Sequence, residues 1–172
     1  ELKKERMALN DKDNPDANCL PMGLTQFHTH GQPRKIVQNS SVIAIMYEAN
    51  YGLRYIYIDG RTLPPQGSVQ PFWYGYSVGR WEGDTLVVDT AKLQPGTLFN
   101  NGVEYTENVR LVERFRLADA NTLIVTQQFE DPSSFEGTAA RIMSFRRGDD
   151  HVYPYDCDPT YGLAIESREG PD

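Results

Sequence analysis

The chain has 172 residues, 39% of them hydrophobic, and its 17 Lys and Arg against 24 Asp and Glu give a formal net charge of −7. That length suits one domain, and the longest unbroken apolar run, from Val42 to Tyr47, is far short of the roughly 20 residues that a membrane helix needs. The acidic balance without a Lys and Arg cluster excludes the positive surface that nucleic-acid binding requires, so we expect neither a membrane span nor a nucleic-acid partner.

The two ends of the chain differ in character from its middle. Residues 1–18 begin as a short charged helical pattern and end in Asn, Asp and Pro turn residues, which predicts an N-terminal arm. After residue 147 the chain carries seven acidic residues and one arginine, so most of the negative charge lies there. We therefore expect a main domain over 19–157 and a solvated acidic tail over 158–172.

After the arm the dominant pattern has a period of two, typical of β-strands. Residues 42–49 are apolar on both faces, and residues 53–59 place Tyr55 and Tyr57 on one face and Arg54 on the other. These two segments predict a first hairpin.

Residues 72–82 and 85–90 predict a second hairpin around a Gly-Asp loop, a register that pairs Trp81 with Leu86. On one face of its first strand, Trp73 and Trp81 are separated by three small residues. Small residues there leave space above the sheet for a ligand or for a neighbouring element.

A third hairpin is predicted over 109–117 and 123–129, with a helix as the alternative for the start of its first strand. One face of that strand is apolar except for Glu113, and matching the apolar faces of the two strands places Glu113 opposite Gln127.

Residues 138–147, in which Arg141 alternates with apolar residues, add another strand, and 153–157 would close the sheet. About eight short strands joined mostly by tight turns predict an all-β fold, either a sandwich or, as we favour, an antiparallel up-and-down lipocalin-like β-barrel.

Cys19 and Cys157 are the two cysteines and lie near opposite ends of the predicted domain. If paired, they close a loop that spans most of the chain, and the chain-entropy account assigns such a bond about 4 to 5 kcal/mol. A disulfide implies an oxidising compartment, whereas two buried free thiols in a cytosolic protein are the alternative. The chain starts at Glu1, which fits either a removed export signal or a boundary within a longer chain.

Residues Gly75–Thr90 read GYSVGRWEGDTLVVDT, which resembles the signature of a family of uncharacterised bacterial proteins that are often exported. Further matching segments are Cys19-Leu20-Pro21, Tyr57–Arg61, Val112–Arg116 and Glu130-Asp131-Pro132. The resemblance covers most of residues 19–157 and implies a bacterial protein of the periplasm or extracellular space, but no activity. Family members often carry His where Tyr105 stands and Cys-Glu-Glu-Asn where this chain has Cys157–Thr160.

A second, local resemblance lies within residues 46–82. Met46–Ile58 (MYEANYGLRYIYI) and the later Gly79-Arg80-Trp81 look like the opening of the phenolic acid decarboxylases, cofactor-free lipocalin-like barrels whose lumen uses tyrosines, an arginine and a glutamate. This resemblance implies a barrel and suggests a catalytic alternative.

Glu113 is the first candidate for chemistry. A carboxylate among apolar side chains has a raised pKa, which tunes a general acid or base toward neutrality. In a cofactor-independent lyase or isomerase, Tyr55, Tyr57 or Arg141 would orient an anionic substrate. The alternative is a structural pair of Glu113 with Arg141 or Gln127.

The leading prediction is that the lumen binds a small aromatic or apolar molecule without a cofactor. Its predicted contacts are Trp73, Trp81, Tyr47 and Gln127. Each of the aromatic residues taken alone is also explained by core packing.

A third hypothesis is a metal-dependent enzyme. His28 and His30 project from the same side of an extended segment, and His151 could complete a set of three ligands for a divalent transition metal, Zn or Cu. Exposed histidines in a loop are the alternative.

Overall fold

The computed structural model describes residues 15–48, 50, 52–97, 104–149, 151–153 and 157–158. The helices in these ranges are the 3-10 helix η2 (Pro15–Asn18) and the short α-helix α2 (Gly23–Phe27). The strands are β1 (Arg34–Gln38), β2 (Val42–Tyr47), β3 (Gly52–Tyr57), β4 (Tyr76–Glu82), β5 (Thr85–Ala91), β6 (Gly96–Thr97), β7 (Glu104–Tyr105), β8 (Arg110–Asp119), β9 (Thr122–Glu130) and β10 (Ala139–Arg146).

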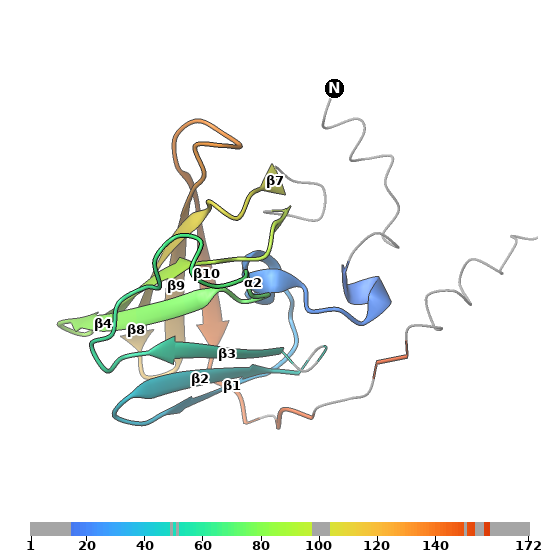
Figure 1. Ribbon diagram of the computed structural model, residues 1–172. Coiled ribbons are helices and arrows are strands. Elements are labelled where there is room, and N and C mark those ends of the chain that lie inside the picture. Colours follow the sequence, from blue (N-terminus) through green and yellow to red (C-terminus); the bar gives the residue numbers. More distant parts are fainter. Residues whose placement is uncertain are drawn as a thin grey trace, which may run out of the picture.

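Eight of these strands form one sheet in the order β1-β2-β3-β4-β5-β8-β9-β10, which follows the chain. The sheet curls around its concave face into a half-barrel (Figure 1). All neighbours are antiparallel except β3 and β4, which run parallel with Ile56 beside Ser77. A parallel pair needs a long return connection, and residues 58–75 supply it. The prediction of an all-β, barrel-like fold with sequential strands is therefore confirmed.

The three predicted hairpins are present, and the second and third have the predicted registers. Val42 lies opposite Tyr57 in the first, Trp81 lies opposite Leu86 in the second, and Glu113 lies opposite Gln127 in the third. Because residues 110–119 form a strand, the helical alternative there is wrong.

Three strand predictions need correction. The strand β1 was not predicted, because its residues are mostly exposed and so lack an apolar stripe. The second hairpin begins at Tyr76 rather than at residue 72, because Gly75 adopts a positive φ of 65° that interrupts an extended strand. The predicted strand 153–157 lies in part outside the described residues, and Tyr153 belongs to no strand.

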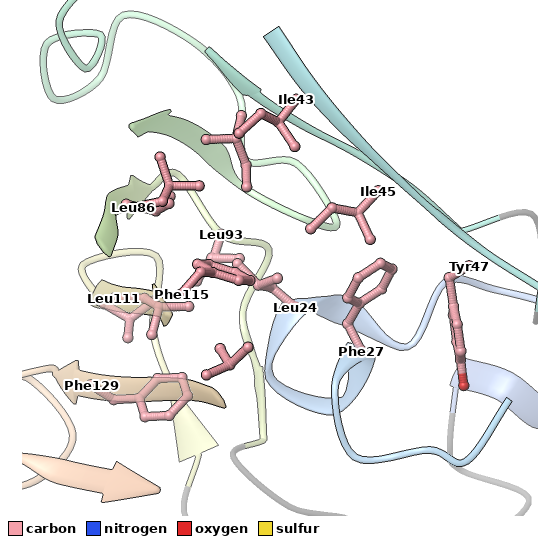
Figure 2. Packing of buried hydrophobic residues seen from close by; sticks show 14 of the residues in the cluster. Leu24, Phe27, Ile43, Ile45, Tyr47, Leu86, Leu93, Leu111, Phe115 and Phe129 are labelled. Carbon is pink, nitrogen blue, oxygen red and sulfur yellow. The ribbon is translucent and has the colours of Figure 1, made fainter. Parts of the chain in front are cut away.

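The core fills the concave side of the sheet. Figure 2 shows Leu24 and Phe27 of α2 packed toward Ile45, Phe115 and other strand residues. Each large apolar side chain buried this way contributes about 1.5 to 3 kcal/mol. α2 thus belongs to the core, although the sequence analysis expected only strands between the arm and the tail.

The expected space above β4 is filled by a neighbouring element. A Cβ placed on Gly79 would lie 2.9 Å from Ile56 Cγ2 and 3.2 Å from Leu86 Cδ1. The small residue at this position therefore permits close packing of β3, β4 and β5 rather than bordering a cavity.

Cys19, directly after η2, forms a disulfide with Cys157, and their Cα atoms are 5.5 Å apart. The predicted covalent link between the two ends of the domain is therefore present. The greater part of the predicted arm and nearly all of the predicted tail lie outside the described residues. Among the described helices, none has the length and apolar character needed to cross a membrane.

Candidate ligand-binding cavity

A cavity of about 890 Å³ lies between the loop 28–34 with β1 and β2 on one side and β8, β9 and β10 on the other. Strand alternation turns every second side chain of β8 and β9 toward it. Its larger apolar lining side chains are Ile36, Ile45, Phe115, Leu117, Leu123, Val125, Met143 and Phe145, joined by Pro33 and Ala120. The polar residues that accompany these are concentrated in the loop and at the end of β10.

The charged side chains of this lining are all basic. They are the arginines Arg34, Arg146 and Arg147, joined by the titratable His28 and His30, and no Asp or Glu of the described residues lines the cavity. The protein as a whole carries a net charge of −7. The cavity therefore has a charge opposite to that of the chain.

Arg34 holds the loop in place. Its Nη2 donates hydrogen bonds to the carbonyl oxygens of Phe27, at 2.8 Å, and His30, at 2.6 Å. The guanidinium carbon lies 4.8 Å from the ring centre of Tyr47 and 4.9 Å from that of Phe145, which are cation–π distances. Its Nε is buried without a hydrogen-bond partner among the described residues.

A buried polar cluster lies beside the cavity, with Glu113 at its centre. Glu113 Oε2 accepts a short hydrogen bond from Arg54 Nη2, and both side chains are fully buried. Glu113 Oε1 accepts a 2.7 Å hydrogen bond from Gln127 Nε2 and lies 3.4 Å from His28 Nε2. Arg54 also donates to Ser77 Oγ and Thr90 Oγ1, each at 3.1 Å.

Glu113 faces inward, as predicted, but its pKa moves in the opposite direction to the one expected. Burial by itself raises the pKa of a carboxyl group. The charge of Arg54, together with His28, outweighs burial and lowers the pKa of Glu113 to about 2. Glu113 is therefore an ionised partner of a buried arginine at neutral pH, and the expectation of a raised pKa is wrong.

His28 follows α2 directly and lines the cavity. Its ring packs edge-on against Phe27, Phe115 and Phe145, with centroid distances of 5.1, 5.9 and 5.6 Å. Burial lowers the pKa of His28 more than the neighbouring Glu113 raises it, so the imidazole is neutral near pH 7. Neither ring nitrogen makes a hydrogen bond among the described residues. Because Nε2 lies 3.4 Å from a carboxylate oxygen of Glu113, we assign the ring proton to Nε2, which leaves Nδ1 as the basic nitrogen.

Arg141 belongs to the same cluster through Gln127. Arg141 Nε donates to Gln127 Oε1 at 2.6 Å, and Nη2 donates a short hydrogen bond to the carbonyl oxygen of Thr25 in α2. Burial lowers the pKa of Arg141 to about 10, so the side chain stays charged at neutral pH. Gln127 thus bridges Glu113 and Arg141, and neither Gln127 nor Arg141 lines the cavity.

Four of the aromatic candidate residues lie away from the cavity. Tyr55, 46% exposed, is on the outer face of β3, and Tyr57 stacks there with Tyr76 and Arg61. Trp81 is 51% exposed at the end of β4, and Trp73 is half-buried in the turn before that strand. The two tyrosines do not meet Glu113, because alternation along β3 turns Arg54 inward and the tyrosines outward.

Tyr47 is buried beside the cavity wall. Its hydroxyl donates to Gln32 Oε1 at 2.7 Å, and its ring contacts Arg34 and Phe27. Tyr47 therefore supports the loop 28–34 from behind and is not one of the residues that line the cavity.

The predicted set of three histidines is not assembled. His30 lines the cavity near His28, whereas the ring of His151 packs against Tyr153. Within the described ranges no three His, Cys, Asp or Glu side chains gather in the manner of a metal site.

Sequence reasoning missed Arg54 and Arg34. Arg54 shares its strand face with Ile56 and Ile58, so the sequence held a signal for this residue: an arginine in one apolar stripe and a glutamate in another suggest a buried pair.

Comparisons with known proteins supply no counterpart for the cavity or the cluster. No family model, no curated protein and no solved structure matches the chain.

Proposed function

We propose that the half-barrel binds a small molecule with an apolar body in the cavity beside loop 28–34. The observation that carries this proposal is the cavity itself, whose volume of about 890 Å³ falls in the range of roughly 300 to 1,000 Å³ common for ligand sites. Eight large apolar side chains line it, while a few polar groups of the loop lie at one side. The ligand contacts are Phe115, Phe145 and their aliphatic neighbours rather than the predicted tryptophans.

Binding of N-phenyl-1-naphthylamine, a neutral dye that fluoresces in apolar surroundings, tests this function. Met143 lines the cavity, whereas its neighbour Ile142 is 74% exposed on the outer face of β10. We expect Met143→Trp, which fills the cavity, to weaken dye binding at least about tenfold, and Ile142→Trp to leave it unchanged. Equal binding by both folded variants, or no binding by the parent protein, would overturn the proposal.

A cofactor-independent lyase or isomerase is the second candidate, and the environment of His28 favours it. A neutral imidazole beside a cavity, with one nitrogen facing a carboxylate, has the arrangement of an oriented general base. In this alternative His28 Nδ1 takes a proton from the ligand, and Glu113 is a positioning residue that fixes the ring and stabilises the imidazolium.

Exchange of ligand C–H protons with D2O, followed by NMR on any molecule that binds the cavity, tests the catalytic alternative without knowledge of the product. We expect His28→Gln to abolish the exchange while the affinity persists. Glu113→Gln should slow exchange and shift the pH profile to lower pH, because the carboxylate raises the pKa of His28. Exchange that survives in His28→Gln would exclude His28 as the base.

The disulfide supports a third element of the proposal, a location in the bacterial periplasm or extracellular space. Disulfides persist in oxidising compartments and are rare in the cytosol, and Cys19 and Cys157 are the only cysteines of the chain. Alkylation of the protein in intact cells before lysis tests this location. Two protected cysteines are expected, and two alkylated cysteines would contradict it.

A further inference from the structure

The charge of the cavity is one-sided in a way that its volume does not explain. Arg34, Arg146 and Arg147 line it, and no carboxylate of the described residues does. The excess of negative charge in the chain makes this local excess of arginine more notable. A neutral apolar ligand alone would leave the positive charge of these three guanidinium groups without a bound counter-charge.

Arg34 is the only one of the three arginines that is partly buried, so its charge is the least well solvated. Burial lowers its pKa, and none of the ion pairs among the described residues includes it. Its hydrogen bonds go to neutral carbonyl oxygens, and no side chain or backbone group in the described part of the chain bonds to its Nε. A half-buried charge without an opposite charge is destabilising, and a bound anion would offset that cost.

The rest of the lining restricts where such an anion lies. The ring of Phe145 covers the guanidinium of Arg34 at 4.9 Å and also lines the cavity. Charged and apolar surfaces therefore meet at one point of the wall. A ligand that satisfies both has a charged head and a hydrocarbon body.

We propose that the ligand of this cavity is an amphipathic anion, whose single negatively charged head group lies at Arg34 and whose hydrocarbon body packs among Phe115, Val125 and Met143. This inference rests on the proposed binding function and specifies its ligand class. Arg146 and Arg147, exposed at the end of β10 and just beyond it, add positive potential at the rim and attract the anion to the entrance.

Displacement of the neutral dye by three molecules with the same ten-carbon chain tests the inference. The probes are decanoate, decan-1-ol and decylammonium, all used as monomers at low salt. Charge-assisted hydrogen bonds are stronger than neutral ones, so we expect decanoate to bind at least about tenfold more tightly than decan-1-ol and decylammonium to bind weakest. Equal affinities for the acid and the alcohol, or displacement by none of the three probes, would overturn the anion inference while leaving the binding function intact. Failure of the dye itself to bind would overturn both.

Variants then locate the head group. Arg34→Gln should remove most of the preference for decanoate over decan-1-ol, and the double variant Arg146→Gln and Arg147→Gln should reduce it by a smaller factor. Arg116→Gln is the matched control, because Arg116 is exposed and outside the cavity lining but loses the same charge. An unchanged preference in folded Arg34→Gln would overturn the role of Arg34.

Because Arg34 also holds loop 28–34, its substitution can disturb the fold. NMR on the unaltered protein therefore gives a second test of whether the head group lies at Arg34. The guanidinium carbon of Arg34 lies 4.8 Å and 4.9 Å from the ring centres of Tyr47 and Phe145, so ring currents displace the Nε–H resonance from those of exposed arginines. We expect decanoate to shift that resonance and decan-1-ol to leave it within its line width. Shifts of equal size with both molecules would contradict the inference even if every Arg34 variant fails to fold.

Discussion

Arg54 of β3 and Glu113 of β8 form an ion pair in which both side chains are fully buried. Strands β4 and β5 lie between β3 and β8 in the sheet, so the pair crosses the inside of the curve. Ser77 and Thr90, on the two intervening strands, also bind Arg54. One guanidinium therefore contacts side chains from three other strands.

Removal of either partner is expected to destabilise the fold strongly. Arg54→Met or Glu113→Gln leaves an unpaired or weakly paired buried charge, and the free energy of unfolding should fall by about 3 to 5 kcal/mol. Urea denaturation measures this change. Arg80→Met, which breaks exposed pairs with Glu82 and Asp89, is the control and should be close to the parent.

A double variant distinguishes the interaction between Arg54 and Glu113 from the cost of leaving one buried charge without its partner. Arg54→Met combined with Glu113→Leu removes both charges, so its loss of stability should be well below the sum of the two single losses. Additive losses would show that the two side chains are not coupled.

The stability of the protein should depend on pH through Glu113. Its folded pKa of about 2 lies below the ordinary value of 4.5, so the unfolded chain takes up the proton first as the pH falls. The stabilisation is therefore present above about pH 4.5 and is lost as the pH falls toward 2. Urea unfolding at several pH values in this window should show a flatter profile for Glu113→Gln than for the parent. Parallel profiles would contradict the lowered pKa.

Loss of the disulfide should weaken the fold without changing its architecture. The bond joins residues 138 positions apart, and such a loop gives a loss of about 3 to 5 kcal/mol in the unfolding free energy when the bond is absent. We expect this loss in Cys19→Ser with Cys157→Ser, and in the parent protein after reduction. A reductant should have no effect on the double variant, and an effect there would point to another cause.

Substitution of Gly79 tests the close packing of β3, β4 and β5. A methyl group at this position meets Ile56 Cγ2 at 2.9 Å, and overpacking of this kind costs about 1 to 3 kcal/mol. Gly79→Ala should therefore lower the midpoint of thermal unfolding. Gly31→Ala is the matched control, since nothing lies within 4 Å of its Cβ position. A parent-like Gly79→Ala would mean that the interior has room to adjust.

The registers of the second and third hairpins were predictable because each depends on neighbours in sequence. A period of two and a short turn determine which residues face each other, and Glu113 lies opposite Gln127 for that reason. The strand β1 escaped prediction because RKIVQ is an edge segment with most of its residues exposed, so burial imposes no pattern on it.

The site was only partly predictable because its contacts cross the interior. Whether Arg54 or Tyr55 points inward depends on which face of β3 finds partners on distant strands, and aromatic content alone favoured the wrong face. The lowered pKa of Glu113 follows from the same contact, because a carboxyl group without Arg54 beside it would have the raised pKa expected of a buried acid. Sequence spacing identified the acid but not its counter-ion.

The parallel step between β3 and β4 has a mechanical consequence. Only two residue pairs, Ile56 with Ser77 and Tyr57 with Val78, join these strands, whereas six pairs join β2 to β3. The sheet thus has a weak seam that divides β1–β3 from the rest, and the cavity walls come from both sides of it. Arg54 of β3 links the two sides of this seam through its ion pair with Glu113 of β8. Loss of that ion pair would allow the two cavity walls to separate and the cavity to widen.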